Sequence, residues 1–453
     1  MTTLDAPRGE PAHARAAEKQ PPKKQRRPRP GRLRAAWRVL GPGLVTGASD
    51  DDPSGIATYA QAGAKYGYGL LWTALITLPL MTAVQEICDR TALATGKTLG
   101  ELARSHFGRR ARIGIGALIV ALVVANALNI AADLVAIGEG MHLLHAGPAW
   151  AWSLVAGTLI TTLILLGAYK LIQHAFKILC LSLLSYVVVL YAAHVPWGVV
   201  AVHTLIPHIT WSRDYLALLV AVLGTTISPD LFFWQTADRV EEMRAEDGNG
   251  TRALPLKRRT TLGAKRKQRS SRYDVFTGMT LSNLVMFAII TATAGTLGRH
   301  GAADITSAAQ AAGALRPVAG SLAASVFALG FIGSGMLAVP VLAGSGSVGL
   351  AGLLGKPWGL SLSVRQAPVF YLLIAAGTVG GTLLTLTAVN PISLLVLSAT
   401  VNGIAAAPFL IVVMLVSADR PLMGEYRNGV LATVLGWSTV ALMAAAGIAT
   451  FAG

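Results

Sequence analysis

Three consecutive carboxylates in an otherwise apolar run constrain this chain more than any other feature. Asp50–Asp52 directly precede Pro53 within the apolar residues 39–64. A charge at bilayer depth costs about 2.5–3.5 kcal/mol on insertion scales. Because Pro53 cannot donate a backbone hydrogen bond and Gly55 adds backbone freedom, we expect the helix to open here. Open backbone at membrane depth must line a cavity or be buried in protein, so the pattern indicates a metal-cation site at the midpoint of a broken helix.

The composition is that of a polytopic membrane protein. Of the 453 residues, 53% are hydrophobic and only 13% are charged, whereas soluble proteins carry about 25% charged residues. Cys88 and Cys180 are the only cysteines, and each lies in an apolar run. Neither a disulfide framework nor a zinc-ligand set is therefore indicated. We expect no resident cofactor, so a divalent metal ion would be cargo.

The hydrophobic pattern predicts an all-α fold of about eleven transmembrane helices, since a span needs roughly 17–25 mostly apolar residues. The predicted spans are 38–64, 68–92, 112–140, 148–168, 174–195, 213–238, 274–298, 316–350, 366–387, 391–417 and 430–452.

The charge distribution orients these spans. With the N-terminus inside, almost all of the 38 Lys and Arg residues fall on the cytoplasmic side, as the positive-inside rule requires. We therefore expect a multi-pass protein of the cell membrane with its N-terminus cytoplasmic and its C-terminus outside. The basic residues left outside are Lys65, Arg213, Arg299 and Arg316.

Two basic stretches flank or interrupt the predicted transporter domain, 37–453. Residues 1–36 read as a disordered cytoplasmic tail, and 244–272 as a disordered cytoplasmic loop insertion. Both would meet anionic lipids at the inner leaflet. This placement explains the net charge of +16 without a nucleic-acid partner.

A weak internal duplication is visible in the positions of two helix breaks. The 38–64 span breaks at Asp52-Pro53-Ser54-Gly55, and the 213–238 span breaks at residues 225–230, Thr-Thr-Ile-Ser-Pro-Asp. Interrupted segments in corresponding positions of two halves indicate the substrate site of an inverted-repeat transporter. The halves would be a five-plus-five repeat, about 38–195 and 213–417, with 430–452 as an extra helix.

Three motifs carry a resemblance to a known family. The sequence Gly41-Pro42-Gly43, followed by 52–58 (Asp-Pro-Ser-Gly-Ile-Ala-Thr) and by 61–64 (Gln-Ala-Gly-Ala), resembles the first helix of the NRAMP (natural resistance-associated macrophage protein) family. Residues 90–102 and Asp133 are similar to that family's second and third helices. The resemblance implies a five-plus-five inverted-repeat fold that carries divalent metals, usually manganese or iron, with protons.

The resemblance also implies a set of site residues. It makes Asp52 the central charged ligand and places backbone carbonyls at Ser49 and Thr225. The chain departs from the family at several of these positions. Gly55 replaces an asparagine, Ser228 a methionine, Asp230 a histidine, Gln235 a second histidine, Ala136 a glutamate and Thr400 a glutamine.

These departures favour a harder ion. Thioether suits soft transition metals, whereas carboxylate, hydroxyl and carbonyl oxygens suit magnesium, calcium and manganese. We predict a metal site of Asp52, Ser49, Gly55, Thr225, Ser228 and Asp230. Magnesium and manganese both stay open, and the pattern has a partial similarity to the magnesium-carrying relatives of the family.

Further polar residues are secondary candidates. Asp51, Thr400 and Asn402 are candidates to reach the site, and Asp50 is one for an aqueous vestibule. Asp133 and Glu139 are candidates for a proton relay or gate. Glu86, Asp89 and Arg90 form either a gate or a locally paired helix end. With the family's histidines absent, whether protons accompany the metal stays open.

The predicted function is import of a divalent metal cation by alternating access, and not an enzyme activity. The alternative is an ion-coupled symporter of a small organic solute such as an amino acid, although an aspartate cluster would repel an anionic substrate. An intramembrane metalloprotease would need a His-Glu-x-x-His motif, which the sequence lacks. A sensor or scaffold role is a further alternative.

Overall fold

The computed structural model describes residues 46–47, 49–167, 195–246, 253–297, 305, 307–313, 320, 323–386 and 390–452. They lie within one compact unit, Val39–Gly453, and every element among them is helical. The helices are α3 (Pro53–Tyr66), α4 (Trp72–Thr95), α5 (Leu99–His106), α6 (Arg109–Leu143), α7 (Ala149–Leu165), α10 (Trp197–Leu205), α11 (Arg213–Thr226), α12 (Pro229–Glu246), α13 (Thr261–Thr296), α14 (Ala308–Ala312), α16 (Ala323–Leu354), α17 (Pro368–Leu384), α18 (Pro391–Ala418), α19 (Arg420–Met423) and α20 (Val430–Ala452), with short 3-10 turns η1 (Gly67–Leu70), η3 (Leu256–Arg258) and η7 (Gly424–Tyr426).

The predicted spans can be compared with these helices one by one. Ten of the eleven coincide with described helices, and the eleventh, 174–195, lies outside the described residues. By length and composition alone, six described helices can cross a membrane, and a seventh span results if Pro53–Leu70 and Trp72–Thr95, bent by 107°, count as one. Helices α7 and α17 are apolar but shorter, with 17 residues each. The prediction of an all-α polytopic membrane protein is confirmed.

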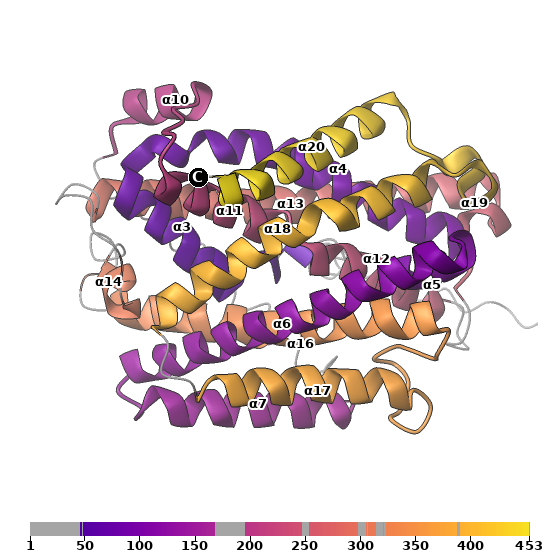
Figure 1. The fold of residues 1–453 in the computed structure, drawn as a ribbon, viewed down its shortest axis with the longest axis horizontal. Helices are drawn as coiled ribbons and strands as arrows, with labels where there is room; N and C mark the ends of the chain where they lie inside the picture. The colour runs from indigo at the N-terminus through magenta and orange to yellow at the C-terminus, as the bar shows by residue number, and fades with distance from the viewer. Residues whose placement is uncertain are drawn as a thin grey trace, which may run out of the picture. The chain divides into compact units, whose positions relative to one another are not determined.

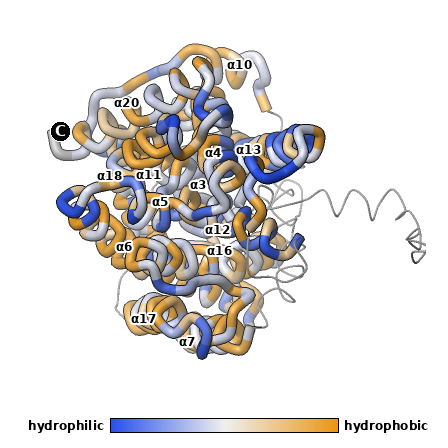
Figure 2. Tube along the Cα trace, turned by 90° about the vertical axis from the view of Figure 1, so that its right-hand side faces the viewer, coloured by the Kyte–Doolittle hydropathy of each residue, from blue (hydrophilic) through white to orange (hydrophobic). Residues whose placement is uncertain are grey.

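The long helices pack in two neighbouring groups (Figure 1). Helices α6 and α16 run along each other, with α7 and α17 packed against α6. On the other side, α18 contacts α3, α6, α11 and α20, while α13 packs on α3 and α4. Large apolar side chains stay exposed on outward-facing surfaces, including Val124, Leu372 and Leu431. Figure 2 shows hydrophobic residues along most of these helices, as expected for surfaces that face lipid.

The stretch 244–272 differs from the loop that the sequence indicated. Helix α12 continues through Glu246, and α13 begins at Thr261, so much of the predicted loop is helical. The Thr260 side chain caps α13 by accepting a hydrogen bond from Gly263 N at 3.3 Å. Lys267 then pairs with Glu242 at 2.8 Å and Glu246 at 2.6 Å. Because Lys and Arg are good helix formers once their charges are paired, the basic composition does not exclude a helix.

A buried polar network joins the ends of α4, α12 and α13. Arg239 Nε donates to Asp89 Oδ1 at 2.5 Å, and Arg239 Nη2 donates to Asp274 Oδ2 at 3.0 Å. Ser271 also donates to Asp89, and Gln235 Nε2 donates to the same carboxylate at 2.7 Å. All five side chains are almost completely buried. The network therefore closes the space between these helix ends with paired charges.

The same network reaches the first broken helix. Thr46 Oγ1 donates to Gln235 Oε1 at 2.5 Å, which links the segment before the break to α12. Of the α4 residues considered as a gate or a local pair, Glu86 and Arg90 are locally paired at 3.1 Å. Asp89 instead belongs to the interhelical network. Glu86 also pairs with Arg272 of α13 at 2.9 Å, so the local pair extends between helices, and a gating role for this cluster stays a prediction.

Glycines permit a close approach of α11 and α18 next to the second break. A side chain on Gly224 would collide with the backbone of Ala399 and Gly403, and a side chain on Gly403 would crowd the backbone of Val220. Small residues allow helix backbones to pack this closely in membranes. The contact positions the C-terminal end of α11 against the middle of α18.

Replacing Gly224 with alanine should loosen this contact. We expect Gly224→Ala to lower stability by about 1–3 kcal/mol, because the added methyl group overpacks a backbone contact. Thermal unfolding of the purified protein measures the effect. Gly114 lies on α6 with no neighbouring atom within 4 Å of an added Cβ, so Gly114→Ala is the matched control and should not lower the melting temperature. Equal melting of the two variants would contradict the packing argument.

Removing the central cation of the network should be more costly. Arg239→Met leaves the buried Asp89 and Asp274 carboxylates without their cation, which typically costs about 3–5 kcal/mol. The measurement is again thermal unfolding, with the exposed Arg266→Met as control. Adding Asp89→Asn to the Arg239→Met variant should recover part of the loss, and no recovery would argue against charge burial as the cause.

Candidate functional site

The first broken helix opens at the predicted residues. Helical backbone at Ser49 and Asp50 gives way at Asp51 and Asp52, and α3 begins at Pro53. Asp52 is the N-cap residue of α3: its Oδ1 accepts hydrogen bonds from Gly55 N and Ser54 Oγ, both at 2.7 Å. An N-cap carboxylate satisfies free amides and is favoured by the helix dipole. Capping therefore fixes the carboxylate of Asp52 at the break.

The second broken helix has the same construction. Helix α11 ends at Thr226, Ile227 leaves the helix with φ −117° and ψ 66°, and α12 begins at Pro229. Asp230 lies in the first turn of α12 and accepts a hydrogen bond from the Ser228 hydroxyl. Both breaks thus present a carboxylate at the N-terminus of the second half-helix.

The two breaks lie against each other. A Cβ built on Gly55 would lie 3.0 Å from Thr225 Oγ1 and 3.4 Å from Asp52 Oδ1. One turn further along α3, the hydroxyls of Tyr59 and Thr226 are hydrogen-bonded at 3.0 Å. The space that a side chain at position 55 would occupy is therefore partly filled by the Thr225 hydroxyl.

The carboxylates around the breaks form an electrostatic cluster. Asp52 and Asp230 repel each other across the two breaks. Asp133, from the middle of α6, interacts with both, and Asp50 also interacts with both. All four side chains are buried. Such a cluster attracts a cation and disfavours an anion.

Several oxygen atoms near the breaks are buried and have no hydrogen-bond partner among the residues that the structure describes. They include Thr225 Oγ1, both oxygens of Asp133 and Asn402 Oδ1. Asn402 precedes Gly403, whose backbone lies against Gly224, so α18 brings it toward the second break. Buried polar atoms are nearly always satisfied in native proteins, and orphaned ones at a functional site indicate an absent ion or water.

Other predicted residues are placed differently. Ser282 Oγ of α13 donates to Asp50 Oδ2 at 2.6 Å and contacts Asp51 Oδ1 at 3.3 Å, so these two carboxylates are held toward α13. Thr400 Oγ1 is half-buried and donates to the Val396 carbonyl at 2.9 Å. Glu139 is half-buried on α6, six residues beyond Asp133, and no contact in the described part of the chain joins it to the breaks.

The side chains at the breaks offer mostly oxygen. Over the described residues, no group of three or more His, Cys, Asp or Glu side chains is placed to hold a metal ion. A metal held by Asp52 and Asp230 would therefore need hydroxyl, amide or carbonyl oxygens as its other ligands. Such a set suits magnesium and manganese.

Sequence reasoning missed two neighbours of the site. Met286 of α13 lies behind the second break, with its sulfur 3.8 Å from Thr226 Oγ1. Asn129 is buried on α6, one turn before Asp133, with both amide atoms unpartnered. The i, i+4 spacing of Asn129 and Asp133 in an apolar helix was a usable signal, whereas no local pattern points to Met286.

Known proteins with similar sequences match this chain over nearly its whole length. The divalent metal cation transporter MntH of Verminephrobacter eiseniae is 28% identical over 420 residues, covering 89% of this chain and 87% of that protein. MntH of Mycobacterium leprae is 25% identical over 416 residues, covering 91% of each.

Solved structures show the same fold. The manganese transporter of Eremococcus coleocola, in complex with an aromatic bis-isothiourea compound, matches with a TM-score of 0.66 at 17% identity, covering 91% of this chain and 87% of that one. MHP1, a nucleobase-cation-symport-1 family transporter, matches with a TM-score of 0.55 at 15% identity, covering 91% and 90%.

A family model described as natural resistance-associated macrophage protein-like matches residues 43–453. That range includes both broken helices and the described α-helices around them. The chain belongs to the NRAMP family.

Proposed function

We propose that this protein imports a divalent metal cation across the cell membrane by alternating access. The observation that supports the proposal is the meeting of two broken helices, where a Cβ on Gly55 would lie 3.0 Å from Thr225 Oγ1 and 3.4 Å from Asp52 Oδ1, with Asp230 near enough to repel Asp52. Relatives over most of the chain are named as divalent metal cation transporters. The metal is cargo, and no resident cofactor is proposed.

The cytoplasmic orientation of the N-terminus follows from the charge distribution. The segments 90–112, 239–272 and 356–365 carry 18 of the 22 Lys and Arg residues in the described part of the chain, as the inner side of a membrane protein does. In this orientation the Asp89–Arg239 network lies between the site and the cytoplasm. Its complete burial supports a closed inner side in this structure.

Magnesium and manganese are the proposed cargo. Asp52, Asp230, Ser228 and Thr225 offer oxygen only, and oxygen ligands suit these ions. The nearby sulfur of Met286 contacts hydroxyl groups of Thr226 and Thr77 and lies behind the break. The proposed ligand set therefore contains no sulfur atom.

An organic-solute symporter is the weaker alternative. The likeness to MHP1 concerns the fold, which unrelated cargoes share. An amino acid would bring a carboxylate of its own into a cluster that already contains Asp52, Asp133 and Asp230. Like charges at this depth would disfavour binding.

Removing the central carboxylate tests the proposal directly. Asp52→Ala should reduce manganese and magnesium uptake into proteoliposomes by more than the roughly 10–100-fold typical of losing an outer partner of a metal ligand. The control is Asp214→Ala, an exposed carboxylate that pairs with Lys65 at 3.3 Å on the surface. Normal uptake by Asp52→Ala would overturn the site, and absence of flux in the wild type would return the organic-solute alternative.

The same vesicles report proton coupling when internal pH is recorded. Acidification during metal entry would make Asp133 and Asp230 the candidates for the relay, because their carboxylates share the cluster with Asp52. Metal entry at constant internal pH would indicate that the metal cation is transported without protons.

A thioether at the second break should change ion preference. Ser228→Met places sulfur where the hydroxyl now contacts Asp230, so cadmium should compete with manganese more strongly and magnesium more weakly than in the wild type. Competition uptake measures the shift. Ser228→Ala separates loss of the hydroxyl from gain of sulfur. If both variants keep the wild-type ion order, Ser228 does not contact the cargo.

A further inference from the structure

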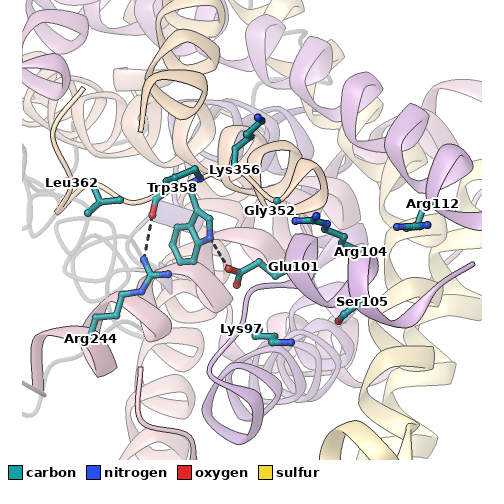
Figure 3. A pocket seen from close by; sticks show the side chains of 12 residues that line it. Lys97, Glu101, Arg104, Ser105, Arg112, Arg244, Gly352, Lys356, Trp358 and Leu362 are labelled. Atoms are coloured by element: carbon teal, nitrogen blue, oxygen red, sulfur yellow. Dashed lines mark hydrogen bonds between the residues drawn. The ribbon is translucent and has the colours of Figure 1, made fainter. Parts of the chain in front are cut away.

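A basic pocket lies away from the candidate metal site, at one end of the helix bundle. It has a volume of about 640 Å³ and is formed by α5, the first turn of α6, the last turn of α12, and the end of α16 with the loop that follows (Figure 3). The charge distribution assigns all these helix ends to the cytoplasmic side. Its lining includes Lys97, Glu101, Arg104, Arg112, Arg244 and Lys356.

The charge of the pocket is not balanced from within. Glu101 is its only acidic lining residue, and its carboxylate already accepts from Thr98 N at 2.8 Å and from Trp358 Nε1 at 3.1 Å. Arg244 donates to the Trp358 carbonyl at 3.2 Å and stacks 4.2 Å from the centre of that indole ring. The remaining cations make no ion pair with any described residue. They are Lys97, Arg104, Arg112 and Lys356.

Glycine shapes the wall of the pocket. The Arg104 guanidinium lies directly against Gly355, in the space that a side chain there would fill, and Gly355 has a φ of +67°. Gly352 allows α16 to approach the start of α5, since a Cβ there would lie 3.0 Å from Glu101 N. The position of Arg104 in the wall therefore depends on Gly355.

Two exposed apolar side chains are close in sequence to residues that line the pocket. Ile113, next to Arg112, is 65% exposed, and Leu354, near Lys356, is 53% exposed. Both side chains lie at the ends of membrane-spanning helices, where lipid is the expected neighbour. An anion with an attached acyl chain fits this combination of cations and exposed apolar side chains better than a free anion.

We propose that this pocket binds the phosphate headgroup of an anionic phospholipid from the cytoplasmic leaflet. Arg104, Arg112 and Lys356 bind the phosphate, and Ile113 and Leu354 contact the acyl chains. Basic pockets between transmembrane helices at this side bind such headgroups, and Arg provides paired donors for phosphate oxygens.

A bound headgroup would connect separate elements of the helix bundle. Arg104 belongs to α5, Arg112 to the first turn of α6 and Lys356 to the segment after α16. A ligand that bridges them stabilises the folded protein by mass action. Lipid binding should therefore raise the melting temperature.

The test compares lipid binding by full-length variants in detergent. Phosphatidylglycerol is titrated against phosphatidylcholine, with native mass spectrometry and thermal unfolding as readouts. We expect the wild type to prefer phosphatidylglycerol, and Arg104→Gln/Arg112→Gln/Lys356→Gln to lose about a hundredfold in affinity, at roughly fivefold per removed charge.

A second triple variant controls for net charge. Arg258→Gln/Lys265→Gln/Arg266→Gln removes three exposed cations from η3 and α13, outside the pocket, and should keep wild-type preference. Equal lipid binding by both triple variants would overturn the proposal. So would stabilisation of the wild type by inorganic phosphate alone to the same extent, because that result assigns the pocket to a free anion.

A folding defect can be separated from loss of binding. Lys356→Gln alone changes one exposed side chain and should keep the melting temperature in phosphatidylcholine while losing about fivefold in phosphatidylglycerol affinity; unchanged affinity would count against the proposal. The readout is lipid binding, so failure of metal transport leaves this test intact.

Discussion

Burial of carboxylates at the ends of broken helices is the constraint on which the rest of the site depends. A charge at this depth is costly, and the structure offsets the cost locally. Asp52 accepts two hydrogen bonds at the start of α3, and Asp230 accepts one from Ser228 at the start of α12. Because each proline cannot continue the preceding helix, the break and the cap occur together. Each carboxylate is thereby held at the start of the second half of its broken helix.

The surrounding packing keeps the two breaks in contact. Gly55 allows Thr225 to approach Asp52, and Gly224 allows α11 to lie against α18. Near the C-terminal end of α4, the ion pair between Asp89 and Arg239 connects α4 to α12. Small residues permit close backbone approach, whereas the buried ion pair is tolerated because its members are fully hydrogen-bonded. Small residues therefore determine how closely the two breaks approach, whereas a buried ion pair joins α4 to α12.

The chain belongs to the NRAMP family, and its departures from the family pattern share one chemical trend. Oxygen-bearing side chains replace the sulfur and imidazole expected at the second break, and the Thr225 hydroxyl occupies part of the space beside Gly55. These changes occur together on two helices whose breaks lie against each other, so under the proposed function they would alter one ligand set. The cation-rich pocket at the end of the bundle has the opposite charge, so the two sites would bind oppositely charged ligands.

Local chemistry in the sequence was enough to locate most of the helices and both breaks. It also indicated helical repeats, since apolar length and proline position are properties of short segments. Only the tertiary structure decided which carboxylates face which partners: Asp50 and Asp51 are held by Ser282, and Asp89 is paired with Arg239. It also showed that residues 261–272 are helical and that Met286 lies behind the second break. These outcomes depend on contacts between residues separated by tens to hundreds of positions, and no local pattern encodes such contacts.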